Sequence, residues 1–349
     1  MNSFRSENKT KNNIQLGAVL ALFSLALLFR ASILDERGGD YRVYKESVEE
    51  VLQGENLYEH TQRSFQTPGM KHWYAYLPLW LYLNTISYGI SSLVPFLEFV
   101  VVMKIPVLLG DFALALLLFL ILRKVNFFVA FTATSAWLFN PHLLLTGNYT
   151  HFDPLPSFFV LLSLHFLNGS DVRAAIFAAV AVGFKQYAIL LAPYFLNAVG
   201  NKKRFLLLFV GVLLLLSLPF LLWNPYAYVY STVFAHLSRG FGGKSILAAI
   251  NELFGSFIPS YVGLALIVGL NVWLFVSKRD MDKYAFATLT IGALLLFSPV
   301  LHRTYLLWLL PVYFVWAGFF SSRRTNTNAV FGLLAGGLYL IYWAYLSTY

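Results

Sequence analysis

The sequence predicts an all-α protein that crosses a membrane many times. Of its 349 residues 58% are hydrophobic and only 12% are charged, and the basic residues gather in short clusters between apolar segments. A soluble domain carries about twice this share of charge. Apolar segments such as 205–223 are about 18–19 residues long, which is enough to cross a hydrocarbon core of about 30 Å. The chain is therefore expected to be solvated mainly by lipid.

The basic clusters orient the predicted helices, because cytoplasmic loops are enriched in lysine and arginine. With residues 1–13 inside, more than half of the 25 basic residues fall on the cytoplasmic side. They include Arg123, Lys124, Arg173, Lys202, Lys203, Arg204, Lys278, Arg279, Lys283, Arg323 and Arg324. About eleven transmembrane helices result, in one domain that spans 1–349. They cover approximately 14–34, 97–122, 127–147, 154–167, 174–184, 187–199, 205–223, 260–276, 284–301, 304–320 and 328–347.

Two long stretches, 35–95 and 224–259, are predicted to be external. The first begins with polar residues and continues into an amphipathic helix over 43–52, which Gly54 ends. A second helix over 76–88 is apolar enough to span, but a crossing here would move the following basic clusters outside. We therefore expect it to lie on the outer leaflet, where Tyr and Trp are enriched.

Composition and motifs exclude several classes of function. The chain has no cysteine, so disulfides, thiolate catalysis and cysteine-ligated metals are ruled out. Its net charge of +9 is spread over the clusters and is not gathered on one soluble face, so a nucleic-acid partner is not predicted. No HExxH, P-loop or nucleophile elbow occurs, and no cofactor is required. The first apolar segment lacks a small-residue cleavage site and is expected to span, not to be a cleaved signal peptide.

The predicted topology brings polar residues from several loops to the external face. They are Asp35, Glu36, Asp40, His151, Asp153, Lys185, Gln186, Arg239, Lys244, His302 and Arg303. Carboxylates and cations at one membrane face suit a reaction between an anionic lipid head group and a hydroxyl acceptor. A carboxylate takes the hydroxyl proton, and cations stabilise the phosphate as it leaves.

Several of these residues also have an ordinary structural interpretation. Asp40 follows two glycines and Asp153 precedes a proline, so both are suited to capping a helix. Asp35 and Glu36 fit solvated loop charges, and His151 fits an interfacial histidine with no catalytic role. These alternatives stay open on position alone.

Ionisable residues inside or beside the predicted spans are harder to explain as surface charges. His302 and Arg303 stand directly between two apolar helices, where charge is costly unless it is paired or hydrated. Lys104 and Asp111 are seven residues apart, on roughly one face of a helix. They mark either a cavity or a structural pairing that involves Glu98.

The order of short motifs along nearly the whole chain resembles the GT-C glycosyltransferases, multi-spanning enzymes that use polyprenyl-phosphate sugars. Within that group the chain is similar to dolichyl-phosphate-glucose glucosyltransferases and to the mannosyltransferase that adds the first mannose to GPI anchors. The motifs are Gly39-Asp40-Tyr41 with Tyr44 and Glu49, Gly54 to Tyr58, Tyr76-Leu77-Pro78-Leu79, Lys104 with Asp111, Asn140-Pro141, Gly147 to Asp153, Phe184-Lys185-Gln186, and His302-Arg303 before a Leu-Leu-Pro segment.

The resemblance implies an inverting transfer of a hexose, mannose before glucose, from polyprenyl phosphate to a lipid-linked or cell-envelope acceptor. Asp40 would be the general base on the acceptor hydroxyl. Substrate-binding residues would be His151, Asp153, Lys185, Gln186, His302, Arg303, Lys104, Asp111, Tyr41 and Tyr76. The first loop has Gly-Gly-Asp-Tyr in place of a paired Asp-x-Asp, so no metal ligand is assigned and dependence on a divalent metal stays open.

Two other functions fit the same external face. One is a transporter or flippase of lipid-linked sugars, although no internal repeat is evident; the other is a non-catalytic partner subunit. The small size and the lack of a retrieval signal favour a plasma membrane over an endoplasmic reticulum membrane. The active site is expected on the external or lumenal side.

Overall fold

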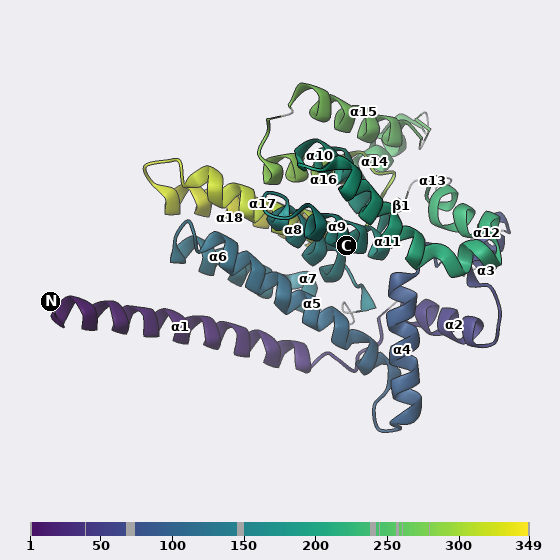
Figure 1. Ribbon diagram of the computed structural model, residues 1–349, viewed down its shortest axis with the longest axis horizontal. Coiled ribbons are helices and arrows are strands. Elements are labelled where there is room, and N and C mark those ends of the chain that lie inside the picture. Colours follow the sequence, from purple (N-terminus) through teal and green to yellow (C-terminus); the bar gives the residue numbers. More distant parts are fainter. Residues whose placement is uncertain are drawn as a thin grey trace.

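The computed structural model is a bundle of α-helices in which the axes of most long helices are roughly aligned (Figure 1). It describes residues 2–38, 40–67, 74–144, 150–237, 242–243, 245–255, 258–259, 261–278 and 280–347. Arg239 and Lys244, which we expected at the external face, lie outside the described residues.

The predicted all-α class is confirmed. The helices are α1 (Asn2–Ala31), α2 (Tyr41–Leu52), α3 (Leu57–Gln66), α4 (Leu79–Leu93), α5 (Phe99–Leu122), α6 (Phe127–Leu138), α7 (Pro141–Leu144), α8 (Pro154–Phe166), α9 (Asp171–Phe184), η2 (Gln186–Leu191), α10 (Ala192–Ala198), α11 (Lys202–Trp223), α12 (Pro225–Val229), η3 (Tyr230–Phe234), α13 (Ala235–Leu237), α14 (Ile246–Phe254), α15 (Tyr261–Ser277), α16 (Lys283–Phe297), η4 (Arg303–Tyr305), α17 (Leu306–Ser321) and α18 (Thr327–Ser347). In the ranges that the structure describes, the only sheet is a parallel pairing of β1 (Gly242–Gly243) with β2 (Val300–Leu301).

Each apolar segment predicted to span has a helical counterpart. By length and composition, four helices can cross a membrane: Asn12–Ala31, Phe99–Leu122, Lys202–Trp223 and Arg303–Ser321. Five shorter apolar helices accompany them: Phe127–Leu138, Pro154–Phe166, Tyr261–Ser277, Lys283–Phe297 and Thr327–Trp343. The helix predicted over 127–147 is wrong in length, since α6 ends at Leu138. Pro141 restricts the residue before it, and the Asn140 side chain accepts a hydrogen bond from the His142 N–H, so a separate turn, α7, begins here.

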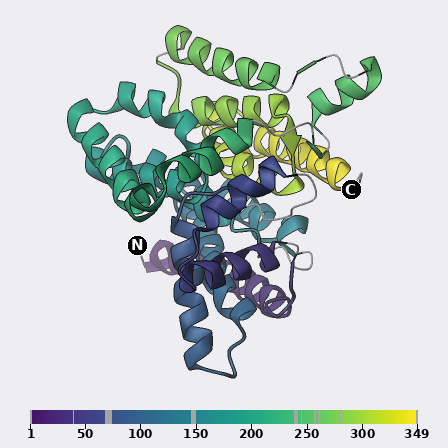
Figure 2. The same ribbon diagram turned by 90° about the vertical axis from the view of Figure 1, so that its right-hand side faces the viewer.

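The first long loop forms two helices, α2 and α3, before the predicted surface helix. Helix α2 ends at Leu52, and Gly54 adopts a φ of 80°, as expected for a glycine that terminates a helix. The helix predicted over 76–88 occurs as α4, which begins after Pro78. It runs across the ends of α1 and α5 and not alongside them (Figures 1 and 2). This direction is the one expected of a helix that lies along a membrane surface.

The centre of the bundle is formed by α5, α8, α9 and α17. Helix α8 packs on α9, α5 and α17. The approach of α5 to α8 is close: a Cβ at Gly110 would lie 2.6 Å from the Leu155 Cδ2 atom. This packing fixes the first residue of α8 and the last residue of α9 beside each other.

A buried ion pair joins α1 to α5. The Arg30 Nε lies 2.7 Å from the Asp111 Oδ2, and both side chains are 0% exposed. The Trp137 Nε1 donates to the other Asp111 oxygen at 2.7 Å. Asp111 therefore has structural partners on two neighbouring helices.

Lys104 binds the turn that follows α1. Its ammonium donates to the carbonyl oxygens of Ile33, at 3.0 Å, and Glu36, which both lie after the last residue of α1. The suggested pairing of Lys104 and Asp111 with Glu98 is wrong, because Lys104 bonds to this turn, Asp111 pairs with Arg30 of α1, and Glu98 pairs with Arg37 at 3.3 Å. Lys104 therefore joins α5 to the segment after α1.

Asp111→Asn should lower the free energy of unfolding by about 3–5 kcal/mol, because the buried Arg30 guanidinium loses its counter-charge. The matched control is Glu98→Gln, which breaks a pair whose side chains are 63% and 62% exposed. Its expected cost is about 1 kcal/mol or less. Denaturant unfolding of both variants in one detergent measures the difference, and equal losses would contradict this account.

Candidate functional site

A buried lysine lies at the centre of the candidate site. Lys185 ends α9 in an extended backbone conformation. Its Nζ lies 2.7 Å from the Asp153 Oδ1, and the two side chains are 7% and 0% exposed. The Trp308 Nε1 donates to the same oxygen, while the Asp153 Oδ2 has no hydrogen-bond partner among the described residues. The pair thus connects the beginning of α8, the end of α9 and the beginning of α17.

Four aromatic rings surround the Lys185 ammonium, and we call them the aromatic cage. The distances from Nζ to the ring centroids are 4.8 Å for Phe152, 5.3 Å for Trp308, 5.4 Å for Tyr76 and 5.8 Å for Tyr305. The Trp308 ring in turn stacks on Tyr187 and Tyr305, with centroids 4.1 Å apart in both cases. The negative faces of the rings attract the ammonium and stabilise it away from water.

Asp40 contacts His151, which lies just before α8. Its Oδ2 lies 3.3 Å from the His151 Nδ1, and the side chains are 39% and 28% exposed respectively. The Tyr44 hydroxyl donates to the same Asp40 oxygen at 3.3 Å. Asp40 precedes α2 and Asp153 precedes α8, but neither side chain makes a capping hydrogen bond. The capping interpretation of both residues is therefore wrong, because their carboxylates bond to side chains instead.

The environment of Asp40 keeps its carboxyl ionised. Burial raises the pKa of Asp40, but the hydrogen bond and charge of His151 and the charge of Lys185 outweigh it, and the pKa lies below its ordinary value of 3.8. Burial raises the pKa of Tyr44 well above its usual range, so its hydroxyl stays a donor. The Lys185 charge lowers the pKa of Asp40, so the Asp40–His151 pair and the Asp153–Lys185 pair form one electrostatic site.

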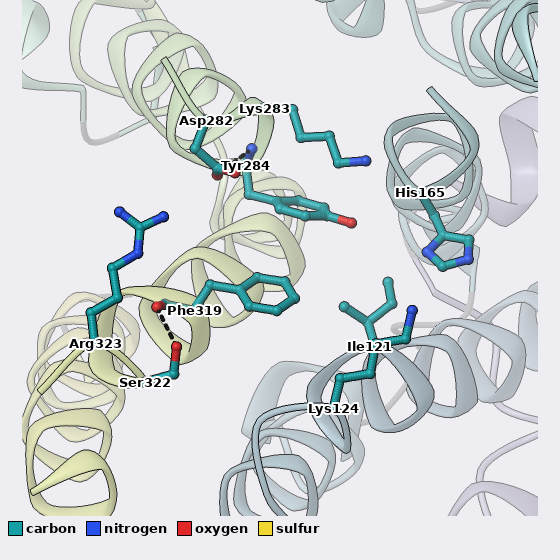
Figure 3. A pocket seen from close by; sticks show the side chains of 9 residues that line it. All are labelled: Ile121, Lys124, His165, Asp282, Lys283, Tyr284, Phe319, Ser322 and Arg323. Carbon is teal, nitrogen blue, oxygen red and sulfur yellow. Dashed lines mark hydrogen bonds between the residues drawn. The ribbon is translucent and has the colours of Figure 1, made fainter. Parts of the chain in front are cut away.

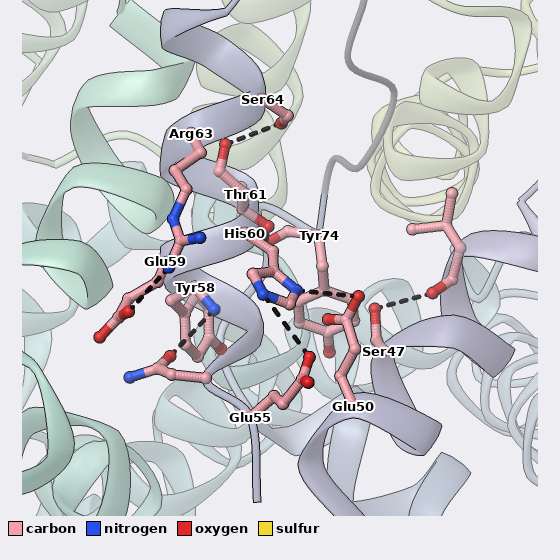
Figure 4. A network of polar contacts seen from close by, with 12 residues as sticks. Ser47, Glu50, Glu55, Tyr58, Glu59, His60, Thr61, Arg63, Ser64 and Tyr74 are labelled. Atoms are coloured by element: carbon pink, nitrogen blue, oxygen red, sulfur yellow. Dashed lines mark hydrogen bonds and ion pairs between the residues drawn. The ribbon is translucent and has the colours of Figure 1, made fainter. Parts of the chain in front are cut away.

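Polar contacts join α2 and α3 and reach Tyr74, two residues before Tyr76 (Figure 4). His60 joins them, with its Nδ1 3.1 Å from Glu50 and its Nε2 3.6 Å from Glu55. The Tyr58 hydroxyl donates to the Tyr76 carbonyl oxygen at 2.9 Å. This network fixes one wall of the aromatic cage.

His302 and Arg303 lie at the rim of the site. Both are exposed, and the His302 ring contacts Tyr305 of the cage edge-on, with centroids 5.4 Å apart. The charge of Arg303 acts on His142, whose ring is 6.5 Å from that of His151. Sequence reasoning did not single out His142, although Asn140-Pro141 directly before it was among the motifs.

Four predicted substrate-binding residues have other contacts. Gln186 donates to the carbonyl oxygens of Ala75 and Thr232. Tyr41 contacts the Phe99 ring and lies beneath the Arg37 guanidinium. Lys104 and Asp111 belong to the junction of α1 and α5 described above. The structure brings Asp40, Tyr76, His151, Asp153, Lys185, His302 and Arg303 together, and it adds Tyr44, His142, Phe152, Tyr305 and Trp308, which had not been assigned a role.

The described part of the chain contains no group of three or more His, Asp or Glu residues arranged to hold a metal ion. The ionisable side chains gathered at the site are carboxylates, an ammonium, a guanidinium and imidazoles.

The sequence model of glycosyltransferase family 87 matches residues 80–299, which is more than half of the chain. The chain belongs to this family. The matched range contains His151, Asp153 and Lys185 of the site. Asp40 and Tyr76 precede it, and His302 and Arg303 follow it. No curated protein matches the family 87 chain in sequence.

Two crystal structures of ArnT from Cupriavidus metallidurans are similar to this family 87 member. The structure bound to undecaprenyl phosphate has a TM-score of 0.55 at 16% identity, over 95% of this chain and 64% of ArnT. The apo structure has a TM-score of 0.54 at 17% identity, over 89% of this chain and 60% of ArnT. The chain thus spans less than two thirds of the length of ArnT. The likeness confirms the polytopic, helical GT-C fold that the motifs implied.

His151→Asn should move the acid limb of kcat/KM to higher pH. If Asp40 is the general base that the resemblance implies, it works only when deprotonated, so activity is lost as pH falls through its pKa. The substitution removes the hydrogen bond and charge that lower the pKa of Asp40, while the burial that raises it remains. The control is His165→Asn, which removes an imidazole at the other end of α8, away from Asp153 and Lys185. An acid limb that stays in place in His151→Asn would exclude this coupling.

Proposed function

We propose that this family 87 member transfers a hexose from a polyprenyl-phosphate sugar to a hydroxyl of a lipid-linked or cell-envelope acceptor, with Asp40 as general base. The observation that supports this most is the pairing, in one electrostatic site, of a part-exposed carboxylate with a buried lysine. The first can accept a proton and the second can hold a phosphate.

Lys185 and Arg303 are the proposed ligands of the donor phosphate. An ammonium has three N–H donors. Among the described residues the Lys185 ammonium donates one hydrogen bond, to Asp153, so donors remain for phosphate oxygens. Arg303 contributes a second, exposed cation at the rim. Cations fixed in advance stabilise the charge that develops as the phosphate leaves. The undecaprenyl phosphate bound in the ArnT crystal structure supports this donor class.

The proposed reaction is one displacement. Asp40 accepts the proton of the acceptor hydroxyl while that oxygen forms a bond to the anomeric carbon. The bond from the anomeric carbon to the phosphate oxygen breaks, and polyprenyl phosphate leaves with the electron pair without needing a proton. A single in-line attack inverts the anomeric configuration. His151 holds Asp40 toward the acceptor.

The family resemblance supports mannose before glucose as the sugar, and one domain over 1–349. The site lies at the end of the bundle that carries α2, α3 and α4 (Figure 1). Lys124 and Arg323 follow the last residues of α5 and α17, at the other end. With the basic clusters in the cytoplasm, this end is external. These grounds assign the side of the membrane, and for the membrane itself we propose the plasma membrane that the sequence favours.

Asp40→Asn should lower the transfer rate by about 10²–10⁴, because the amide cannot accept the hydroxyl proton, while donor binding is kept. The assay uses the purified full chain, synthetic polyprenyl-phosphate mannose with labelled sugar, and a membrane lipid extract as acceptor. The matched control is Asp35→Asn, an exposed carboxylate in the same loop. An unchanged rate in Asp40→Asn would overturn the base assignment, and movement of label across the bilayer without any transfer would indicate a flippase.

The same assay tests which sugar the enzyme transfers. Polyprenyl-phosphate mannose should give a kcat/KM at least about tenfold above that of the glucose donor, since one well-placed hydroxyl contact is worth about this factor. The reverse order would contradict the choice of mannose and leave the base assignment intact.

A further inference from the structure

A second cluster of cations lies at the other end of the bundle. A pocket of about 340 Å³ opens between the last turns of α5, α8 and α17 and the first residues of α16. Helix α8 connects the two regions, since Asp153 precedes its first residue and His165 lies in its last turn. In Figure 3 the side chains of Lys124, His165, Lys283 and Tyr284 point toward one another across this pocket.

The cations of this pocket make no close ion pair with a carboxylate in the part of the chain that the structure describes. None of the ion pairs found among the described residues includes Lys124, His165 or Lys283. Asp282 is the one carboxylate in the lining, and its Oδ1 accepts hydrogen bonds from the backbone N–H groups of Tyr284 and Ala285 at 2.9 and 3.1 Å. It acts there as a helix cap.

The positive groups are close enough to repel one another. The charges of Lys124 and Lys283 both act on His165. Lys124 also acts on Lys283, where the neighbouring Asp282 acts in the opposite direction. Like charges that converge in a part-buried space are unfavourable unless an anion neutralises them. The positive-inside distribution explains why lysines occur on this face, but it does not require them to point into one pocket while the nearest carboxylate is used elsewhere.

We propose that this pocket binds a phosphate-bearing anion. Two ammonium groups, an imidazole and the Tyr284 hydroxyl offer donors from α8, from α16 and from the end of α5. Phosphate oxygens accept several charge-assisted hydrogen bonds at once. Ile121 and Phe319 form an apolar part of the lining. The pocket lies on the predicted cytoplasmic face, so the phosphate belongs either to an anionic lipid of that leaflet or to a soluble compound. This site is independent of the transfer reaction proposed above.

The test compares two double variants that lose the same charge. Lys124→Gln with Lys283→Gln removes both ammonium groups of the pocket. Lys202→Gln with Lys203→Gln removes two exposed lysines at the start of α11, outside the lining. Binding of inorganic phosphate is measured in detergent, and binding of phosphatidic acid is measured by native mass spectrometry after release from nanodiscs that also contain phosphatidylcholine.

The pocket variant should bind at least one of the two probes about tenfold or more weakly than wild type, and the control variant should match wild type. A difference with inorganic phosphate identifies a soluble ligand class, and one confined to phosphatidic acid identifies a lipid head group. Equal binding by all three proteins, or equal losses in both variants, would overturn the proposal. If the pocket variant does not fold, Lys124→Gln alone is compared with Lys202→Gln, with the same expected direction.

Discussion

The contact between Lys185 and Asp153 is the interaction on which the site depends. Removing two charges from water costs several kcal/mol for each ion, and their mutual attraction offsets this only when further polar contacts are present. Here the Trp308 indole donates to the carboxylate, and the aromatic cage faces the ammonium. The contact is possible only because α8, α9 and α17 pack with their ends together.

This arrangement also determines the protonation of Asp40. The Lys185 charge acts on the Asp40 carboxyl together with His151, and both oppose the effect of burial. Asp40 and Lys185 are nearly 150 residues apart in sequence, so the acid–base property of the first loop depends on packing in the middle of the chain. A change at Trp308 or Asp153 would therefore alter the chemistry of a residue that neither of them contacts.

Much of the fold follows from sequence because hydrophobic length and lysine placement are strong, local signals. They predicted the spans and separated α4 from them, and the loop polarity then indicated that Asp40, His151, Asp153 and Lys185 would meet. Capping by Asp40 and Asp153 was the wrong alternative, since a helix start is a local pattern whereas the partner of a carboxylate depends on tertiary packing. Trp308 and Phe152 gave no distinct signal among the 62 aromatic residues of a lipid-solvated chain. A helix break at Asn140-Pro141 could be predicted from the sequence. The position of His142 beside His151 could not, because it depends on how the neighbouring helices pack.

The crosswise direction of α4 has a mechanical consequence. Its surface carries exposed apolar side chains at Ile86, Ile90 and Leu93, and Phe96 follows them. In a bilayer these side chains favour the depth at which lipid covers them, and the polar side of the helix opposes deeper insertion. Helix α2 packs on α4, and Asp40 stands at its first turn. The depth of α4 in the membrane therefore determines how far the Asp40 carboxylate lies from the hydrocarbon core. A lipid-borne phosphate, which is held at a fixed level by its own chain, would meet that carboxylate without leaving its leaflet.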